Sequence, residues 1–121
     1  MPEERRKSKR FKVKDGSFAC ITSKSRKVGA ILDISTDGVA FKYMADERWH
    51  GPVSGPSELE IFNREGNFHL KGISLEPSSD VPLAGPHFLP SALMRRLGGR
   101  FQGITADQWA QLGQFIQKFA T

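Results

Sequence analysis

KVGAILDISTDGVAFKYM, residues 27–44, contains two apolar runs, 27–34 and 38–44, separated by a short polar segment. Both runs are short and rich in Val, Ile and Phe, which is typical of β-strands. The segment between them, Asp-x-Ser-x-x-Gly at residues 33–38, suits a tight turn. Asp and Ser side chains can bond to the local backbone there, and Gly can adopt a left-handed conformation. This stretch therefore predicts two strands joined by a turn.

Four further segments repeat this pattern on either side of the stretch. They are residues 17–23, 57–62, 67–76 and 98–103. The clearest hairpin signal lies at residues 63–67, where Gly66 can supply the positive φ that such a loop needs. We expect the strands on either side of it to pair antiparallel. The predicted fold class is mostly β.

The last part of the chain has a different period. Five apolar residues recur there at helical spacing: Trp109, Leu112, Phe115, Ile116 and Phe119. Thr105 and Gln108 form a capping-box pattern in front of them. Residues 105–119 should therefore form an amphipathic helix whose apolar stripe is part of the core, covering the end or side of a small barrel.

Residues 77–96 show no clear periodicity and contain four of the seven prolines. The segment is predicted to be a long loop between two strands, of a length that is often functional or disordered.

The basic residues are concentrated at the N-terminus. Residues 1–14 hold seven of the 18 Lys and Arg and two of the 13 Asp and Glu, a balance of +5, so the other 107 residues are neutral with eleven of each sign. We expect residues 1–14 to be a flexible basic arm and residues 15–121 to be the folded body. Such an arm attracts anions, above all phosphates, because the arginine fork matches their geometry. The alternative is a solvated tail with no specific role.

The totals limit the function further. A chain of 121 residues is one ordinary domain. The single cysteine, Cys20, allows no internal disulfide, and no apolar run is long enough to span a bilayer, so a cytoplasmic location without membrane insertion is expected. The three histidines lack metal-ligand spacing, and the common phosphate-loop and hydrolase signatures are missing. We therefore expect no metal, no cofactor and no enzymatic activity.

Two sequence motifs are informative when they are considered together. One is Arg-x-x-x-Arg at residues 6–10, preceded by Arg5, and the other is the Asp-x-Ser-x-x-Gly at residues 33–38. Their combination, with the arginines before the first strand and the turn between the second and third, resembles the PilZ domain family. The resemblance extends over roughly residues 5–119. It implies a six-stranded antiparallel β-barrel with a C-terminal amphipathic α-helix.

PilZ domains are receptors for cyclic di-GMP, so the resemblance implies this ligand. Arg6 and Arg10 match the family's two arginines, which bind phosphates and guanine; a guanidinium can bond to guanine O6 and N7 or stack on the base. Asp33 and Ser35 match the pair that contacts guanine. Gly38 is expected to keep the turn tight and to let the ligand approach the backbone.

Arg5 occupies the position that the family associates with ligand stoichiometry. A basic residue there is similar to members that bind a stacked pair of cyclic di-GMP molecules. We expect the arm to become ordered over the barrel when ligand binds, and an unidentified effector protein to recognise the new surface.

Two other functions remain open. A small β-barrel could bind nucleic acid through the basic arm. The neutral body makes nucleic acid an unlikely partner, because basic and aromatic residues would then be expected over the barrel too. The third possibility is an adaptor of the PilZ fold without a nucleotide ligand, but such members typically lack one of the two motifs.

Overall fold

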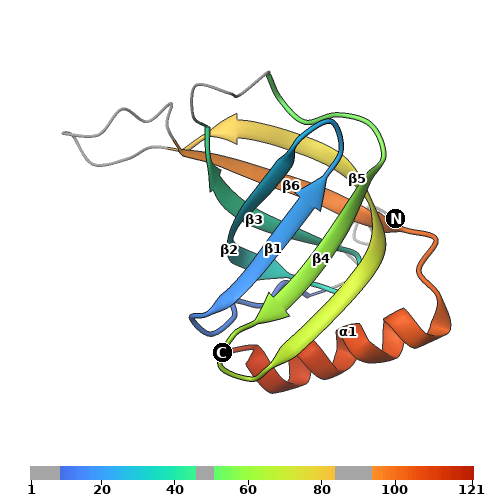
Figure 1. Ribbon diagram of the computed structural model, residues 1–121. Coiled ribbons are helices and arrows are strands. Elements are labelled where there is room, and N and C mark those ends of the chain that lie inside the picture. The colour runs from blue at the N-terminus through green and yellow to red at the C-terminus, as the bar shows by residue number, and fades with distance from the viewer. Residues whose placement is uncertain (1–8, 46–50, 84–93) are drawn as a thin grey trace, which may run out of the picture.

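The computed structural model describes residues 9–45, 51–83 and 94–121, which form a closed six-stranded β-barrel and a C-terminal helix (Figure 1). The elements are β1 (Ser17–Thr22), β2 (Arg26–Ile34), β3 (Gly38–Met44), β4 (Ser57–Asn63), β5 (Phe68–Pro82), β6 (Met94–Gln102) and α1 (Ala106–Phe119). The strands follow the order β1-β2-β3-β6-β5-β4, all neighbours are antiparallel, and β4 pairs with β1 to close the barrel. The predicted fold class is confirmed.

Alternation along the strands separates the core from the surface. In β3, Val39, Phe41 and Tyr43 are buried in the barrel, whereas Lys42 and Met44 are exposed. The period of two in a strand places such residues on opposite faces. The sequence predicted the first four strands to within one residue at each end.

The predicted loop at 77–96 is wrong at both of its ends. β5 continues through Pro77 to Pro82, and β6 begins at Met94 rather than at residue 98. The pairing of β5 with β6 shifts register between Pro77 and Ser79, and such a bulge accommodates a proline and breaks the alternation that sequence reading relies on. The remainder of the predicted loop, residues 84–93, lies outside the described residues.

The predicted hairpin joins β4 to β5, but its conformation differs from the expectation. Asn67 has the positive φ, 52°, while Gly66 does not. A Cβ atom at Gly66 would lie 2.3 Å from Cζ of Phe119. The glycine is therefore needed because the last aromatic residue of the helix packs against the turn.

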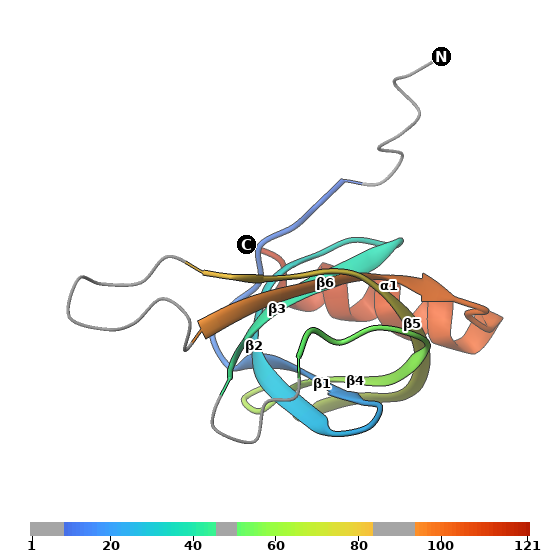
Figure 2. The ribbon, with the colours of Figure 1, turned by 90° about the horizontal axis from the view of Figure 1, so that it is seen from above.

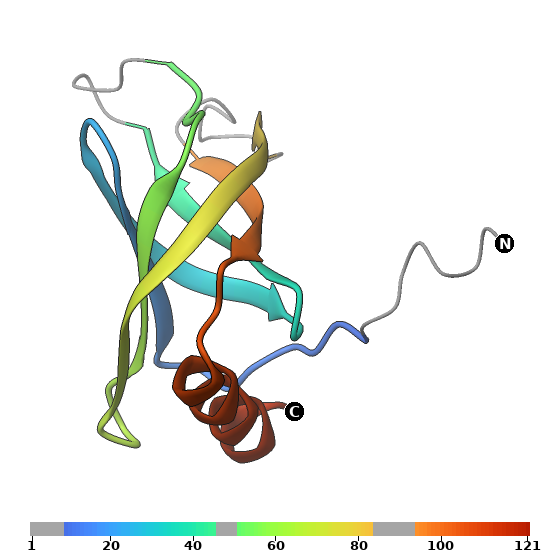
Figure 3. The same ribbon diagram turned by 90° about the vertical axis from the view of Figure 1, so that its right-hand side faces the viewer.

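Helix α1 lies across one end of the barrel (Figures 1 and 3). Its predicted capping box is present, with Thr105 and Gln108 each bonding to the other's backbone. Leu112, Phe115 and Phe119 are buried, but Trp109 is 45% exposed, so the predicted core stripe is wrong for that residue. Within the described ranges, no helix has the length and apolar character needed to cross a membrane.

The described part of the N-terminal arm is attached to the barrel by backbone hydrogen bonds. Phe11 exchanges two bonds with Ile34 at the end of β2, of 2.8 and 2.9 Å. The Lys14 amide donates to the Phe119 carbonyl, beyond which Thr121 donates to Lys12. Figure 2 shows the arm leaving the barrel beside the C-terminus. Pairing with the barrel thus begins at Phe11, before the predicted arm boundary at residue 14, and residues 1–8 lie outside the described residues.

Gly29 provides a test of how closely the strands approach. A Cβ atom there would lie 1.4 Å from the Lys42 carbonyl oxygen of β3, so Gly29→Ala must move backbone. We expect it to lower the free energy of unfolding by about 2 kcal/mol, as overpacking does. Gly113→Ala is the matched control, because nothing lies within 4 Å and helical alanine is preferred by about 0.5–1 kcal/mol. Urea denaturation should show opposite shifts of the two variants, and equal shifts would contradict the close approach.

Candidate functional site

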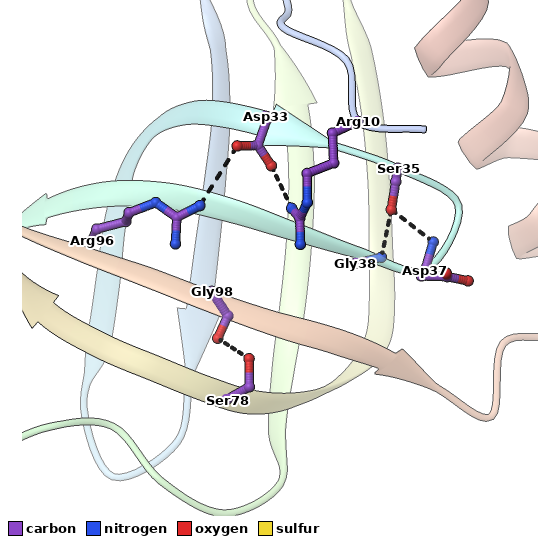
Figure 4. A network of polar contacts seen from close by, with 8 residues as sticks. All are labelled: Arg10, Asp33, Ser35, Asp37, Gly38, Ser78, Arg96 and Gly98. Carbon is purple, nitrogen blue, oxygen red and sulfur yellow. Dashed lines mark hydrogen bonds and ion pairs between the residues drawn. The ribbon is translucent and has the colours of Figure 1, made fainter. Parts of the chain in front are cut away.

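A polar pocket of about 300 Å³ lies on the outside of the barrel, where the β2–β3 turn meets β5 and β6. It is lined by Arg10, Ser35, Asp37, Gly38, Val39, Ala40, Ser78, Ser79, Arg96, Gly98, Gly99 and Arg100. Three arginines and one aspartate make the lining net positive. Figure 4 shows most of its polar groups and Asp33 beside them. The pocket is therefore suited to an anion with hydrogen-bonding edges.

Backbone pairing between the arm and β2 places two predicted site residues, Arg10 and Asp33, beside each other. Because Phe11 pairs with Ile34, the neighbouring Arg10 and Asp33 emerge on the same outer side of the barrel. Arg10 Nη1 donates to Asp33 Oδ1 at 2.6 Å, and Arg96 Nη2 lies 3.6 Å from Asp33 Oδ2. Asp33 is largely buried, at 16% exposure of its side chain, while Arg10 is 45% exposed. One carboxylate thus holds an arginine from the arm and faces another from β6.

Ser35 shapes the turn itself. Its Oγ accepts hydrogen bonds from the amides of Asp37 at 3.0 Å and Gly38 at 3.2 Å, and its own amide donates to the Gly38 carbonyl at 2.9 Å. The side chain is nearly fully buried. The expectation that a serine bonds to its local backbone in this motif is confirmed. Its predicted contact with a ligand remains a prediction.

Gly38 is required for a different reason from the one expected. Its φ is not positive, so the expected left-handed conformation is wrong. A Cβ atom at this position would lie 2.1 Å from the carbonyl oxygen of Gly99, which pairs next to it on β6. The glycine lets β3 and β6 approach closely, and it lines the pocket with bare backbone.

Sequence reading missed the contribution of β5 and β6. Arg96 and Arg100 line the pocket from β6, and Ser78 and Ser79 line it from the bulge in β5. Alternation along residues 94–102 could have revealed the two arginines, because Leu97 and the residues two positions away from it face the core. For Ser78 and Ser79 in the bulge, no alternation pattern indicates a place in the pocket.

The other predicted site residues, Arg5 and Arg6, lie outside the described residues. The structure therefore brings together Arg10, Asp33, Ser35 and Gly38 of the predicted set. Across the described part of the chain, no three His, Cys, Asp or Glu side chains gather as they would around a metal ion.

Comparison by sequence finds no relative. No family model matches the chain, and no curated protein matches it.

Comparison by structure does find neighbours. The Bacillus subtilis inhibitor of motility, MotI/DgrA, superposes with a TM-score of 0.63 at 17% identity, covering 93% of this chain and 50% of that one. The Klebsiella pneumoniae protein MrkH, solved as a complex with cyclic di-GMP, gives a TM-score of 0.65 at 16% identity, covering 93% of this chain and 51% of its own. The chain spans about half the length of either neighbour. Both are PilZ-domain proteins, and this chain has a PilZ-like fold.

Proposed function

We propose that this protein is a non-enzymatic receptor for cyclic di-GMP that acts in bacterial second-messenger signalling. The observation that carries the proposal is the meeting of Arg10, Asp33 and the Ser35 turn at one positively charged pocket. These residues come from segments 23 positions apart, so the fold has to bring them together. That MrkH was solved with this nucleotide supports the choice of ligand.

The chemistry of the pocket fits a guanine nucleotide with phosphodiester groups. The Asp33 carboxylate can accept from guanine N1–H and the exocyclic amine, and a guanidinium can bind phosphate oxygens or guanine O6 and N7. In the structure the Asp33 oxygens face Arg10 and Arg96. Ligand binding would exchange these contacts for contacts with the base and the phosphates, which keeps the buried carboxylate paired.

The proposal also covers how the N-terminal arm signals ligand binding to a partner protein. Residues from Phe11 onward already pair with the barrel. We propose that ligand extends this order toward the N-terminus through Arg6 and Arg5, and that an effector protein recognises the resulting surface. Arg5 would help to neutralise the phosphates of a stacked ligand pair.

Titration calorimetry with cyclic di-GMP at near-physiological salt, with GTP as the control ligand, tests the proposal. We expect micromolar or tighter binding of cyclic di-GMP with one or two molecules per chain, and no measurable binding of GTP. Hydrogen exchange on the same samples should show new protection of residues 5–10 in the complex. Equal protection with and without ligand would contradict the ordering of the arm.

The absence of cyclic di-GMP binding would refute the receptor. A single-stranded oligonucleotide is the second comparison ligand. Binding to it that falls steeply with added salt and ignores guanine content would instead favour a nucleic-acid-binding barrel.

A further inference from the structure

The pocket floor is a strip of small residues between two arginines on β6. The strand register aligns Ala40, Gly98 and Ser79 across β3, β6 and β5. Gly98 lies midway between Arg96 and Arg100, and all three share the outer face of β6 because side chains alternate along a strand. The two arginines are four positions apart along the strand, which corresponds to about 13 Å between their Cα atoms.

The two arginines of β6 make weaker or fewer contacts with other side chains than Arg10 does. Arg10 is bound to Asp33 at 2.6 Å, whereas Arg96 has only the longer 3.6 Å approach to that carboxylate. Within the described residues, Arg100 has no side-chain hydrogen bond or ion pair. Glu76 lies opposite it on β5, but no ion pair joins the two side chains. The guanidinium groups of β6 are thus the least committed cations of the pocket.

We propose that Arg96 and Arg100 form a phosphate-binding subsite, one on each side of the strip of Ala40, Gly98 and Ser79. This rests on the proposed function and adds β6 as a third ligand-binding segment beside the arm and the turn. The strip has no side chain larger than alanine or serine, so a phosphodiester can lie close to the backbone over Gly98. The arginine forks on both sides can then bind its oxygens in a bidentate manner.

Gly98 is part of the subsite because of the space above it. A Cβ atom there would lie 3.1 Å from Ser79 Oγ and 3.4 Å from Arg96 Nη1, which are the ends of side chains rather than backbone. Its φ is not in the left-handed region, so a larger residue can be accommodated without backbone strain. Gly98→Val should therefore fill the strip and leave the barrel intact.

Calorimetric titration of cyclic di-GMP into Arg96→Gln, Arg100→Gln and Gly98→Val tests the subsite. We expect each substitution to weaken binding about 10-fold or more, because each removes a charged donor or the space for its anion. Arg100→Lys should recover only part of the affinity, since lysine keeps the charge without the fork. Arg64→Gln is the matched control: it removes the same charge in the β4–β5 turn, lines a different pocket, and should not change affinity.

The outcomes separate the subsite from the function on which it rests. If the wild-type protein binds and Asp33 variants do not, while Arg96→Gln, Arg100→Gln and Gly98→Val bind normally, the subsite is wrong and the receptor stands. If the wild-type protein does not bind cyclic di-GMP, the receptor is wrong and the subsite with it. If affinity falls equally in Arg64→Gln, only the net charge matters and the subsite is again wrong.

Discussion

Replacing Asp33 by asparagine is expected to weaken cyclic di-GMP binding by about 100-fold or more. The change is nearly isosteric, but it replaces one acceptor oxygen by an amide donor and removes the charge that guanine N1–H and the exocyclic amine would meet. Losing one member of a desolvated charged contact typically costs 2–5 kcal/mol, and 100-fold corresponds to about 2.7 kcal/mol. Calorimetry with wild-type and variant protein measures the ratio directly.

Asp37→Asn is the control for this prediction. Asp37 belongs to the same turn, and its substitution removes the same charge. Unlike Asp33, it is exposed and lines the pocket, whose other charged lining residues are three arginines. Its negative charge opposes phosphate, so the variant should bind equally well or more tightly. The free energy of unfolding of both variants should lie within about 1 kcal/mol of the wild-type value. Asp37 is exposed, and Asp33 pairs with the half-exposed Arg10, an ion pair of a kind that contributes little. Equal loss of affinity in both would contradict a specific role of Asp33.

The regular elements of the fold could be predicted because their signals are local. Val39, Phe41 and Tyr43 alternate with smaller or polar residues as a half-buried strand requires, and Thr105 with Gln108 marks the start of the helix. These patterns depend on a few neighbouring residues and need no knowledge of the partner strands.

The failures occur where distant segments decide the local structure. The bulge between Pro77 and Ser79 is defined only by pairing with β6, so it interrupted the alternation and made the end of β5 resemble a loop. Gly38 and Gly66 suggested turns with positive φ, whereas contact with Gly99 and with Phe119 explains them. No local pattern contains such contacts.

The candidate site likewise contains residues that local motifs predict and a residue that only the fold brings to the pocket. Arg10, Asp33 and Ser35 could be assigned because they belong to short motifs with a family resemblance, and the pairing of Phe11 with Ile34 brings the two motifs together. Arg96 carries no motif. It directly follows Arg95 in the sequence, yet the two side chains face opposite sides of the barrel wall.

Arg95 points into the barrel and belongs to a buried polar network. Its Nε donates to Asp80 Oδ1 at 2.8 Å, and the same carboxylate accepts from Tyr43 Oη at 2.7 Å and from the Val53 amide at 2.8 Å. Burial by itself would lower the pKa of the Arg95 guanidinium. The hydrogen bond and the charge of Asp80 outweigh burial and raise that pKa above its ordinary value. The Arg95 guanidinium therefore stays charged in neutral solution.

Replacing Asp80 by alanine is expected to lower the free energy of unfolding by about 3–5 kcal/mol. The substitution removes the carboxylate that pairs with the Arg95 charge and that accepts from the Tyr43 hydroxyl and the Val53 amide. A loss of this size is a large part of the total stability of an ordinary domain. Urea denaturation followed by circular dichroism measures it, and a loss below about 1 kcal/mol would show that water or neighbouring groups satisfy the donors.

Arg95→Met separates the cost of an unpaired charge from the cost of lost packing. Alone, it should destabilise the barrel less than Asp80→Ala, because Asp80 keeps the hydrogen bonds from Tyr43 and Val53. The double variant should be more stable than Asp80→Ala, since methionine fills similar space and leaves no buried cation. It should not reach the wild type, because the Tyr43 hydroxyl and the Val53 amide still lack their acceptor. Strictly additive losses would instead mean that Arg95 and Asp80 stabilise the barrel independently.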